Sequence, residues 1–432
     1  MVDGSGTELR DRTRRLCNRH DADVRGLRAR LRRSVRVATN VSLWMLERRW
    51  GMEFQAFRAL KDMTPSNPGP HGQQLRLDVE PPDQFATSGS PAPVPNPPAQ
   101  PLASTRMSLE PFTSVEICAG AGGQALGLEQ AGFEHLALVE YEHAACQTLR
   151  LNRPWWNVVE DDLREVVRRC DLAVYGGVDL LAGGVPCPPF SLAGKQLGAE
   201  DDRNLFPAAL DLVGQLQPSV VMIENVRGLL GSKFSGYRGE IESRLDDLGY
   251  HAHWKLLHAS DYAVPQLRPR ALMVALRRDL GVTWEWPQEH PEHAPTVGTA
   301  LRDLMGSAGW RHADAWAERA NRIAPTLVGG SKKHGGPDLG PTRAKAEWAS
   351  MGVDAMGVAA ELPGPDWPAE APPRLTVQAA AILQGFPSEW KIWGRKTAAY
   401  RQVGNAFPPP VARAVGEHIV DVLAACRQLA AA

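Results

Sequence analysis

The sequence predicts an α/β protein built on an open, mostly parallel sheet. Short apolar runs, each typical of a strand buried on both faces, recur between residues 114 and 276 and alternate with helix-length stretches. A glycine-rich loop follows the first run, and residues able to carry chemistry stand at the ends of later runs. Because open α/β sheets bind ligands at the carboxyl ends of their strands, these residues outline one candidate site.

The first expected element is a strand at Ser114–Cys118, followed by a glycine loop and a helix through Gln130. Glycines allow a sharp turn and a close approach to a ligand, and the helix N-terminus favours an anion. The spacing of Gly120, Gly122 and Ala125 also fits a dinucleotide fingerprint, with Glu140 twenty residues after the first glycine. A nicotinamide or flavin cofactor is therefore an open alternative at this point.

Three later runs are interpreted as parallel strands, at residues 178–184, 218–223 and 271–276. Cys187 follows the first run on a loop stiffened by prolines, which is a placement typical of a nucleophile. Glu224 follows the second run, and Arg268 and Arg270 precede the third. The sequence thus predicts a cysteine, a carboxyl group and two guanidinium groups at the edge of one sheet.

The composition is that of a soluble globular chain of 432 residues, 43% hydrophobic and 22% charged. No apolar run approaches the roughly 18 residues of a membrane span, and no secretory signal is recognised. The six cysteines include no CxxC pair, so we expect neither a metal site nor disulfides, and this cysteine usage suits a reducing cytoplasm. With a net charge of −1, nucleic-acid binding would have to rest on local basic patches.

The chain divides by composition. Residues 1–63 are rich in arginine and are expected to form a basic helical extension, either a solvated accessory segment or an arm that contacts DNA or a partner. Residues 64–106 are rich in proline and predict a disordered linker. Residues 107–427 carry the α/β pattern, so we hypothesise that 1–106 are dispensable; a chain that starts at Met107 and is insoluble or inactive would contradict this.

Ordered motifs over about 300 residues resemble those of the DNA (cytosine-5)-methyltransferases of bacterial restriction-modification systems. They are Glu116–Gly123 (S-adenosylmethionine loop), Glu140-Tyr141, Asp162, Gly184–Ser191 (nucleophile loop), Glu224–Val226, Gln266–Arg270, Arg374–Pro387 (ninth motif) and Tyr400–Pro409 (tenth motif). Two positions depart from the family pattern: Cys118 stands where phenylalanine is usual, and Ala379 where an acid is usual. The first puts cofactor packing in doubt, and the second puts helix contacts in doubt.

The resemblance implies a Rossmann-like, seven-stranded methyltransferase fold with an inserted target-recognition domain. The catalytic domain is expected at 107–279, the insert at 280–373, and a C-terminal part that returns beside the cofactor at 374–427. S-adenosyl-L-methionine is the implied cofactor. The residues expected to bind it are Cys118, Ala119, Gly120, Gly122, Gly123, Glu140, Tyr141, Asp162, Leu163, Pro186, Leu205, Asn405 and Ala406.

The implied chemistry is addition of the Cys187 thiolate to C6 of a flipped-out cytosine, which makes C5 nucleophilic toward a methyl group. Glu224 would donate to N3, and must stay protonated near neutral pH to do so. Arg270 would bind O2, while Arg268 orients the loop or a phosphate.

Duplex DNA is the implied partner, and the implied setting is the nucleoid-associated cytoplasm of a bacterium. The chain is expected to be a monomer, and two alternatives stay open: a functional pairing with a cognate restriction endonuclease, or action alone. The residues expected to contact DNA are Ser191, Lys195, Gln196, Thr326, Ser331, Lys332, Lys333 and His334. Three other readings stay open: a tRNA methyltransferase of the same family, a non-catalytic DNA-binding homologue, and a nucleotide-dependent oxidoreductase.

Overall fold

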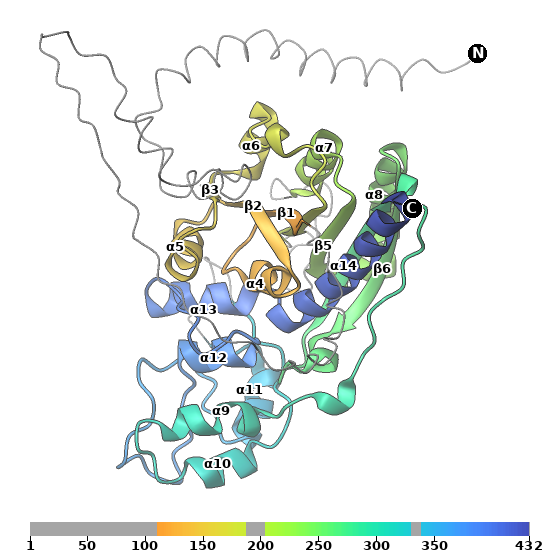
Figure 1. Cartoon of the computed structure of the whole chain (residues 1–432). Coiled ribbons are helices and arrows are strands. Elements are labelled where there is room, and N and C mark those ends of the chain that lie inside the picture. The colour runs from red at the N-terminus through yellow and green to blue at the C-terminus, as the bar shows by residue number, and fades with distance from the viewer. Residues whose placement is uncertain (1–109, 187–203, 330–337, 432) are drawn as a thin grey trace, which may run out of the picture. The chain divides into compact units, whose positions relative to one another are not determined.

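The computed structural model describes residues 110–186, 204–329 and 338–431, all of which belong to one compact unit, Thr105–Ala432. Its centre is a seven-stranded sheet (Figure 1). The strands are β1 (Phe112–Ile117), β2 (Phe133–Glu140), β3 (Val158–Glu160), β4 (Leu180–Gly184), β5 (Val220–Val226), β6 (Tyr250–His258) and β7 (Pro269–Arg277). The spatial order is β3-β2-β1-β4-β5-β7-β6.

Only β7 runs against the other strands. β1 pairs in parallel with β2 and β4, and β4 with β5, whereas β7 is antiparallel to both β5 and β6. The predicted seven-stranded, mostly parallel sheet is confirmed. The interpretation of 271–276 as a parallel strand was wrong, because a run buried on both faces specifies burial and not direction. Since β7 is reversed, its first residues lie beside the carboxyl end of β5, where Val226 pairs with Arg270.

Helices cover both faces of the sheet (Figure 1). The helices of the sheet region are α4 (Gly123–Gln130), α5 (His143–Asn152), α6 (Leu163–Arg169), α7 (Phe206–Leu216), α8 (Ser235–Asp247) and α14 (Pro409–Ala431). Apolar side chains of α6, α7 and α8 share one core with β1, β2 and β5, while α4 and α14 pack with β4 and β7 on the opposite face. None of the helices in the described ranges combines the length and hydropathy of a membrane-spanning segment.

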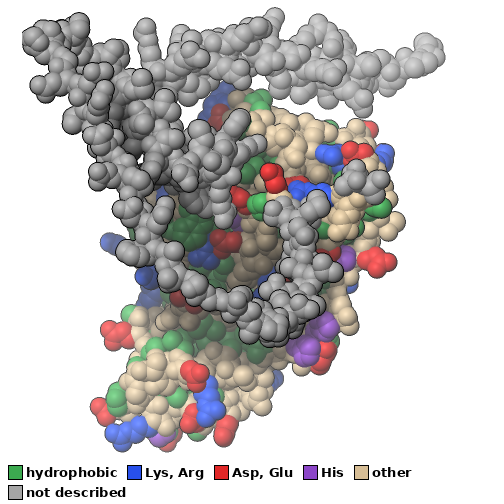
Figure 2. Space-filling model, viewed as in Figure 1, with side chains coloured by type: hydrophobic (Ala, Val, Ile, Leu, Met, Phe, Trp, Pro, Cys, Tyr) green, Lys and Arg blue, Asp and Glu red, His purple; other side chains and the backbone are tan. Residues whose placement is uncertain are grey.

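A second group of helices gathers below the sheet in Figure 1: α9 (Val297–Gly306), α10 (Ala313–Arg319), α11 (Thr342–Ser350), α12 (Val377–Leu383) and α13 (Lys396–Asn405). Three buried tryptophans, Trp310, Trp316 and Trp348, anchor their core, which continues into the glycine loop through Ala119 and Ala121. On the face shown in Figure 2, acidic and basic side chains are interspersed, in keeping with the net charge of −1. The boundaries predicted at 280 and 373 stay a prediction.

Candidate active site

The glycine loop turns sharply between β1 and α4 through a series of left-handed residues. Cys118, Gly120 and Gly122 have φ values of 52°, 55° and 82°. A β-carbon on Gly120 would meet nothing within 4 Å, whereas one on Gly123 would lie 2.2 Å from the main-chain oxygen of Phe407. The loop is therefore open at Gly120, and at Gly123 it is packed tightly against Phe407, which precedes α14.

Glu140 ends β2 directly against the open side of this loop. Its carboxylate accepts hydrogen bonds from the main-chain N–H of Gly120 at 2.8 Å and of Glu142 at 2.8 Å. Burial raises the pKa of Glu140, and these main-chain donors oppose that rise. Tyr141 follows with 61% of its surface exposed, which presents an aromatic ring at the same edge.

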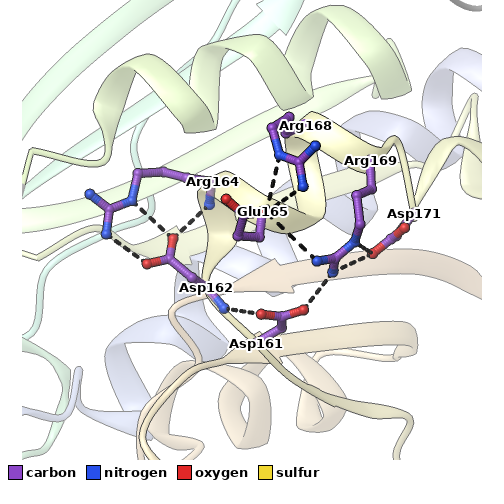
Figure 3. A network of polar contacts seen from close by, with 7 residues as sticks. All are labelled: Asp161, Asp162, Arg164, Glu165, Arg168, Arg169 and Asp171. Atoms are coloured by element: carbon purple, nitrogen blue, oxygen red, sulfur yellow. Dashed lines mark hydrogen bonds and ion pairs between the residues drawn. The ribbon is translucent and has the colours of Figure 1, made fainter.

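Asp162 caps the N-terminus of α6, where β3 leads into the helix (Figure 3). Its Oδ1 accepts from the Arg164 main-chain N–H at 2.8 Å, and its Oδ2 lies 2.6 Å from the Arg164 guanidinium. Hydrogen bonding from Arg164 lowers the pKa of Asp162, so this carboxylate is an anionic acceptor. A neighbouring network joins Asp161 and Asp171 through Arg169. Arg164 was not named among the predicted residues, although an arginine two residues after an acid that caps a helix indicates an ion pair between the two side chains.

Glu224 and Arg270 meet where β5 and the reversed β7 adjoin. The Nε atom of Arg270 lies 2.7 Å from Oε1 of Glu224, and the side chains are 13% and 11% exposed. Burial raises the pKa of Glu224, and the positive charges of Arg270 and Arg268 oppose the rise. A β-carbon on Gly184, at the end of β4, would lie 3.3 Å from Oε2 of Glu224, so the glycine leaves room for this carboxyl group.

The model of the C-5 cytosine-specific DNA methylase family matches residues 112–421 of this chain, which contain the whole sheet. The chain belongs to this family.

Two curated relatives are similar over most of the same region. The Type II methyltransferase M.NaeI of Lentzea aerocolonigenes is 55% identical over 308 residues, which are 71% of this chain and 74% of the relative. The Type II methyltransferase M.NgoMIV of Neisseria gonorrhoeae is 52% identical over 315 residues, which are 72% of this chain and 98% of the relative. The predicted family and the prediction of a DNA (cytosine-5)-methyltransferase are confirmed.

Among solved structures, a prophage-encoded DNA modification methyltransferase from E. coli superimposes with a TM-score of 0.52 at 22% identity. The match covers 72% of this chain and 99% of that one, and it supports the methyltransferase fold alone. The family and the fold imply use of S-adenosylmethionine. The open side of Gly120, the exposed Tyr141 ring and the anionic Asp162 acceptor are groups of the kind that a nucleoside requires, so the described residues fit this cofactor.

The other cofactor residues expected in this methylase lie at the same edge of the sheet or close to it. Leu163 is buried at the start of α6, and Leu205 is buried immediately before α7. Pro186 is half-buried two residues after β4. Ala406 is buried against Gly123, whereas Asn405 is exposed at the end of α13, with its Oδ1 close to Gly329.

Arg268 is fully buried, and the structure commits its guanidinium to main-chain oxygens. Nη1 donates to Leu327 at 2.8 Å, and Nη2 donates to Gly404 at 2.7 Å and to Ala406 at 2.9 Å. These contacts join the segment after α10 to the turn between α13 and α14. They favour the loop-orienting role that the sequence suggested over contact with a phosphate.

Two further residues position the site, and from the sequence they were named only as members of motifs, without a role of their own. Gln266 accepts from the Leu327 N–H at 2.8 Å and donates to the Gln384 side chain at 2.8 Å, beside Arg268. Asn225 is buried and donates to the Val185 main-chain oxygen at 3.2 Å, which holds the chain just before Pro186. Both residues lie within the motifs Glu224–Val226 and Gln266–Arg270, and this membership was the available signal.

Of the expected DNA contacts, only Thr326 is within the described residues. Its hydroxyl donates to the main-chain oxygen of Leu267. Leu267, whose main-chain oxygen Thr326 contacts, is 47% exposed, and Val328, two residues after Thr326, is 45% exposed, so both apolar side chains are open to solvent. The remaining predicted residues lie outside the described ranges: Cys187, Ser191, Lys195, Gln196, Ser331, Lys332, Lys333 and His334.

Trp390 links the segment between α12 and α13 to the glycine loop. Its indole N–H donates to the main-chain oxygen of Ala121 at 3.1 Å, and its ring stacks on Phe386 with centroids 5.9 Å apart. A β-carbon on Gly122 would come within 3.1 Å of this ring. Trp390 is therefore positioned to hold the packed side of the loop in place.

We expect Trp390→Phe to raise the KM for S-adenosylmethionine about tenfold while kcat at saturating cofactor changes less than about twofold. Phenylalanine keeps an aromatic ring at this position, but the buried oxygen of Ala121 loses the indole N–H donor, at a cost of about 1–3 kcal/mol. Trp310→Phe is the matched control. It removes a 3.1 Å hydrogen bond from the Trp310 indole N–H to the main-chain oxygen of Trp367, in the region of helices α9 to α13. An equal change of KM in both variants would contradict a specific role for Trp390.

Proposed function

We propose that this methylase transfers the methyl group to C5 of a flipped-out cytosine in a specific duplex DNA sequence, through a covalent bond between Cys187 and C6. The observation that carries the proposal is the buried pair of Glu224 and Arg270 beside Gly184. The chain leaves β4 at Gly184 and reaches Cys187 three residues later.

The roles of the described residues follow from their charges. Glu224, with its pKa raised by burial, protonates N3 of the cytosine as the Cys187 sulfur bonds to C6, so negative charge does not accumulate on the ring. Arg270 keeps its charge beside Glu224 and stabilises O2. S-adenosylmethionine supplies the electrophilic methyl group. A base or solvent water then takes the C5 proton as the C6–S bond breaks and releases the thiolate, and N3 returns its proton to Glu224, which restores the aromatic ring.

The cofactor is held, in this proposal, by the loop and the strand ends described above. Gly120 leaves space for the cofactor to approach the main chain closely. Glu140 accepts hydrogen bonds from the ribose hydroxyls, and Asp162 accepts one from the adenine amino group. Glu140 already receives two main-chain N–H groups, but each carboxylate oxygen retains a further acceptor site. Tyr141 provides a flat apolar surface for the base.

The biological setting proposed is modification of DNA in a bacterium, either paired with a restriction endonuclease or acting alone. The names of the relatives M.NaeI and M.NgoMIV, both Type II methyltransferases, support this setting. We further propose that the chain acts as a monomer.

Covalent trapping tests the proposed chemistry. DNA in which the target cytosine carries fluorine at C5 should form an adduct with the wild-type chain, stable to denaturing electrophoresis, because the fluorine cannot leave as a proton does. Cys187→Ser should form none. An adduct in the serine variant, or one formed equally well with tRNA as with duplex DNA, would overturn the proposal.

A further inference from the structure

Two histidines and a glutamate cluster at the 3-10 helix η7 (Pro291–His293), and none of the three is among the residues assigned to methyl transfer. His290 precedes this helix, and Glu292 and His293 belong to it. Figure 2 shows histidine side chains gathered beside acidic ones on the lower right of the molecule. Imidazole nitrogen and carboxylate oxygen are the donors that zinc and related first-row dications take in proteins.

The three donor atoms already converge. Nδ1 of His290 lies 3.3 Å from Oε1 of Glu292, and Nε2 of His293 lies 3.7 Å from the same oxygen. All three atoms lie within 4.8 Å of one another. Metal–ligand bonds of about 2.0–2.1 Å in a tetrahedron place neighbouring donors about 3.3–3.4 Å apart. Small side-chain rotations would therefore bring this cluster to the geometry of a bound ion.

The main chain holds the cluster in this arrangement. The His290 N–H donates to the Asp261 main-chain oxygen at 2.8 Å, and the His293 N–H donates to the His290 oxygen at 3.0 Å. Pro291 fixes the backbone angle φ between the ligands. Because the turn is tied to the 3-10 helix η5 (Ala259–Tyr262), less conformational freedom would be lost when an ion binds.

The surroundings favour a cation. His290 and His293 line a cavity of about 430 Å³, whose other walls include the acidic Asp261, Glu417 and Asp421. Its lining, all within the described ranges, includes neither lysine nor arginine, although Arg413 pairs with Glu417 from outside at 2.7 Å. Tyr262 also lines the cavity, and its buried hydroxyl has no hydrogen-bond partner among the residues that the structure describes. Such a concentration of acceptors raises the local concentration of cations.

We propose that His290, Glu292 and His293 form a binding site for one first-row transition-metal dication of the zinc type, with water or a cavity carboxylate completing the coordination. This site goes beyond the proposed methyl transfer and does not take part in it. The alternative is a surface cluster without a metal, in which His290 hydrogen-bonds to Glu292 and His293 lies beside the same carboxylate.

The test is titration of the full-length chain, treated first with a chelator, with Co²⁺ alone. Tetrahedral nitrogen and oxygen coordination gives a visible absorption band, and Zn²⁺ should abolish it by competition. We expect one equivalent bound to the wild type and at least a tenfold loss of affinity in the double variant His290→Ala, His293→Ala. Glu292→Gln should bind more weakly than the wild type.

His251 and His253 on β6 provide the matched control, because this pair also has its rings close together, with centroids 4.6 Å apart. The double variant His251→Ala, His253→Ala should retain the wild-type affinity. Binding that survives loss of His290 and His293, or a wild-type chain that binds no Co²⁺, would overturn the proposal. Neither result bears on methylation, since no catalytic step is measured.

Discussion

Glu224→Gln should lower kcat by about 10²–10⁴-fold and leave the affinity for duplex DNA nearly unchanged. Glutamine keeps the size of the side chain and can still pair with N3 and the exocyclic amine of a cytosine. It cannot transfer a proton to N3, so negative charge would build up on the ring as the thiolate adds. The loss is therefore expected in the chemical step.

The pH dependence gives a second, independent readout. Burial raises the pKa of Glu224, so the protonated carboxyl group extends toward neutral pH and is lost as the pH rises through that raised pKa. The wild-type rate should accordingly fall on the alkaline side. In Glu224→Gln the alkaline fall should disappear, because the amide does not titrate in this range.

Single-turnover methylation at a series of pH values measures both effects. Glu347→Gln is the control, since Glu347 also pairs with an arginine, Arg343 at 3.3 Å, but on the exposed surface of α11. It should match the wild type in rate and in pH profile. If Glu224→Gln kept the alkaline fall, another group would have to be the acid.

The fold and the glycine loop could be predicted from the sequence because both depend on local signals. Buried apolar runs predicted β1, β4 and β5, and the glycines predicted the turn into α4. The direction of β7 could not be predicted, since apolar residues in 271–276 satisfy burial equally in either orientation. It is nevertheless this reversal that brings Arg270 to Glu224.

The contacts between distant segments were the part that sequence reasoning could not supply. Trp390 lies 269 residues from Ala121, and Arg268 lies 138 residues from Ala406. The spacing of a motif does not indicate which main-chain carbonyl oxygen a buried hydrogen-bond donor will contact. The same limit explains why Arg268 was grouped with Arg270, although the two guanidinium groups have different partners.

Arg268→Met should lower the free energy of unfolding by about 3–5 kcal/mol, the cost typical of breaking a buried charge network. Burial and the neighbouring charge of Arg270 lower the pKa of Arg268, while Glu224 opposes this, and the guanidinium donates to the main-chain oxygens of Leu327, Gly404 and Ala406. Methionine fills a similar volume but leaves the oxygens of Leu327, Gly404 and Ala406 buried without this donor.

Arg268→Lys should fall between the wild type and Arg268→Met. A single ammonium has the charge but not the planar fork that reaches Leu327 on one side and the 404–406 turn on the other. Denaturant unfolding of each variant gives the comparison, and the slope of the transition shows whether the same surface is exposed.

Arg302→Met is the matched control for loss of an arginine. Arg302 pairs with Asp314 at 2.7 Å, but its side chain is 59% exposed, so its loss should cost less than about 1 kcal/mol. If Arg268→Met were no more destabilising than Arg302→Met, the buried guanidinium would not be what joins the 327 segment to the turn before α14. Because Gly123 packs on Phe407 in that turn, the loosening in Arg268→Met should also weaken cofactor binding.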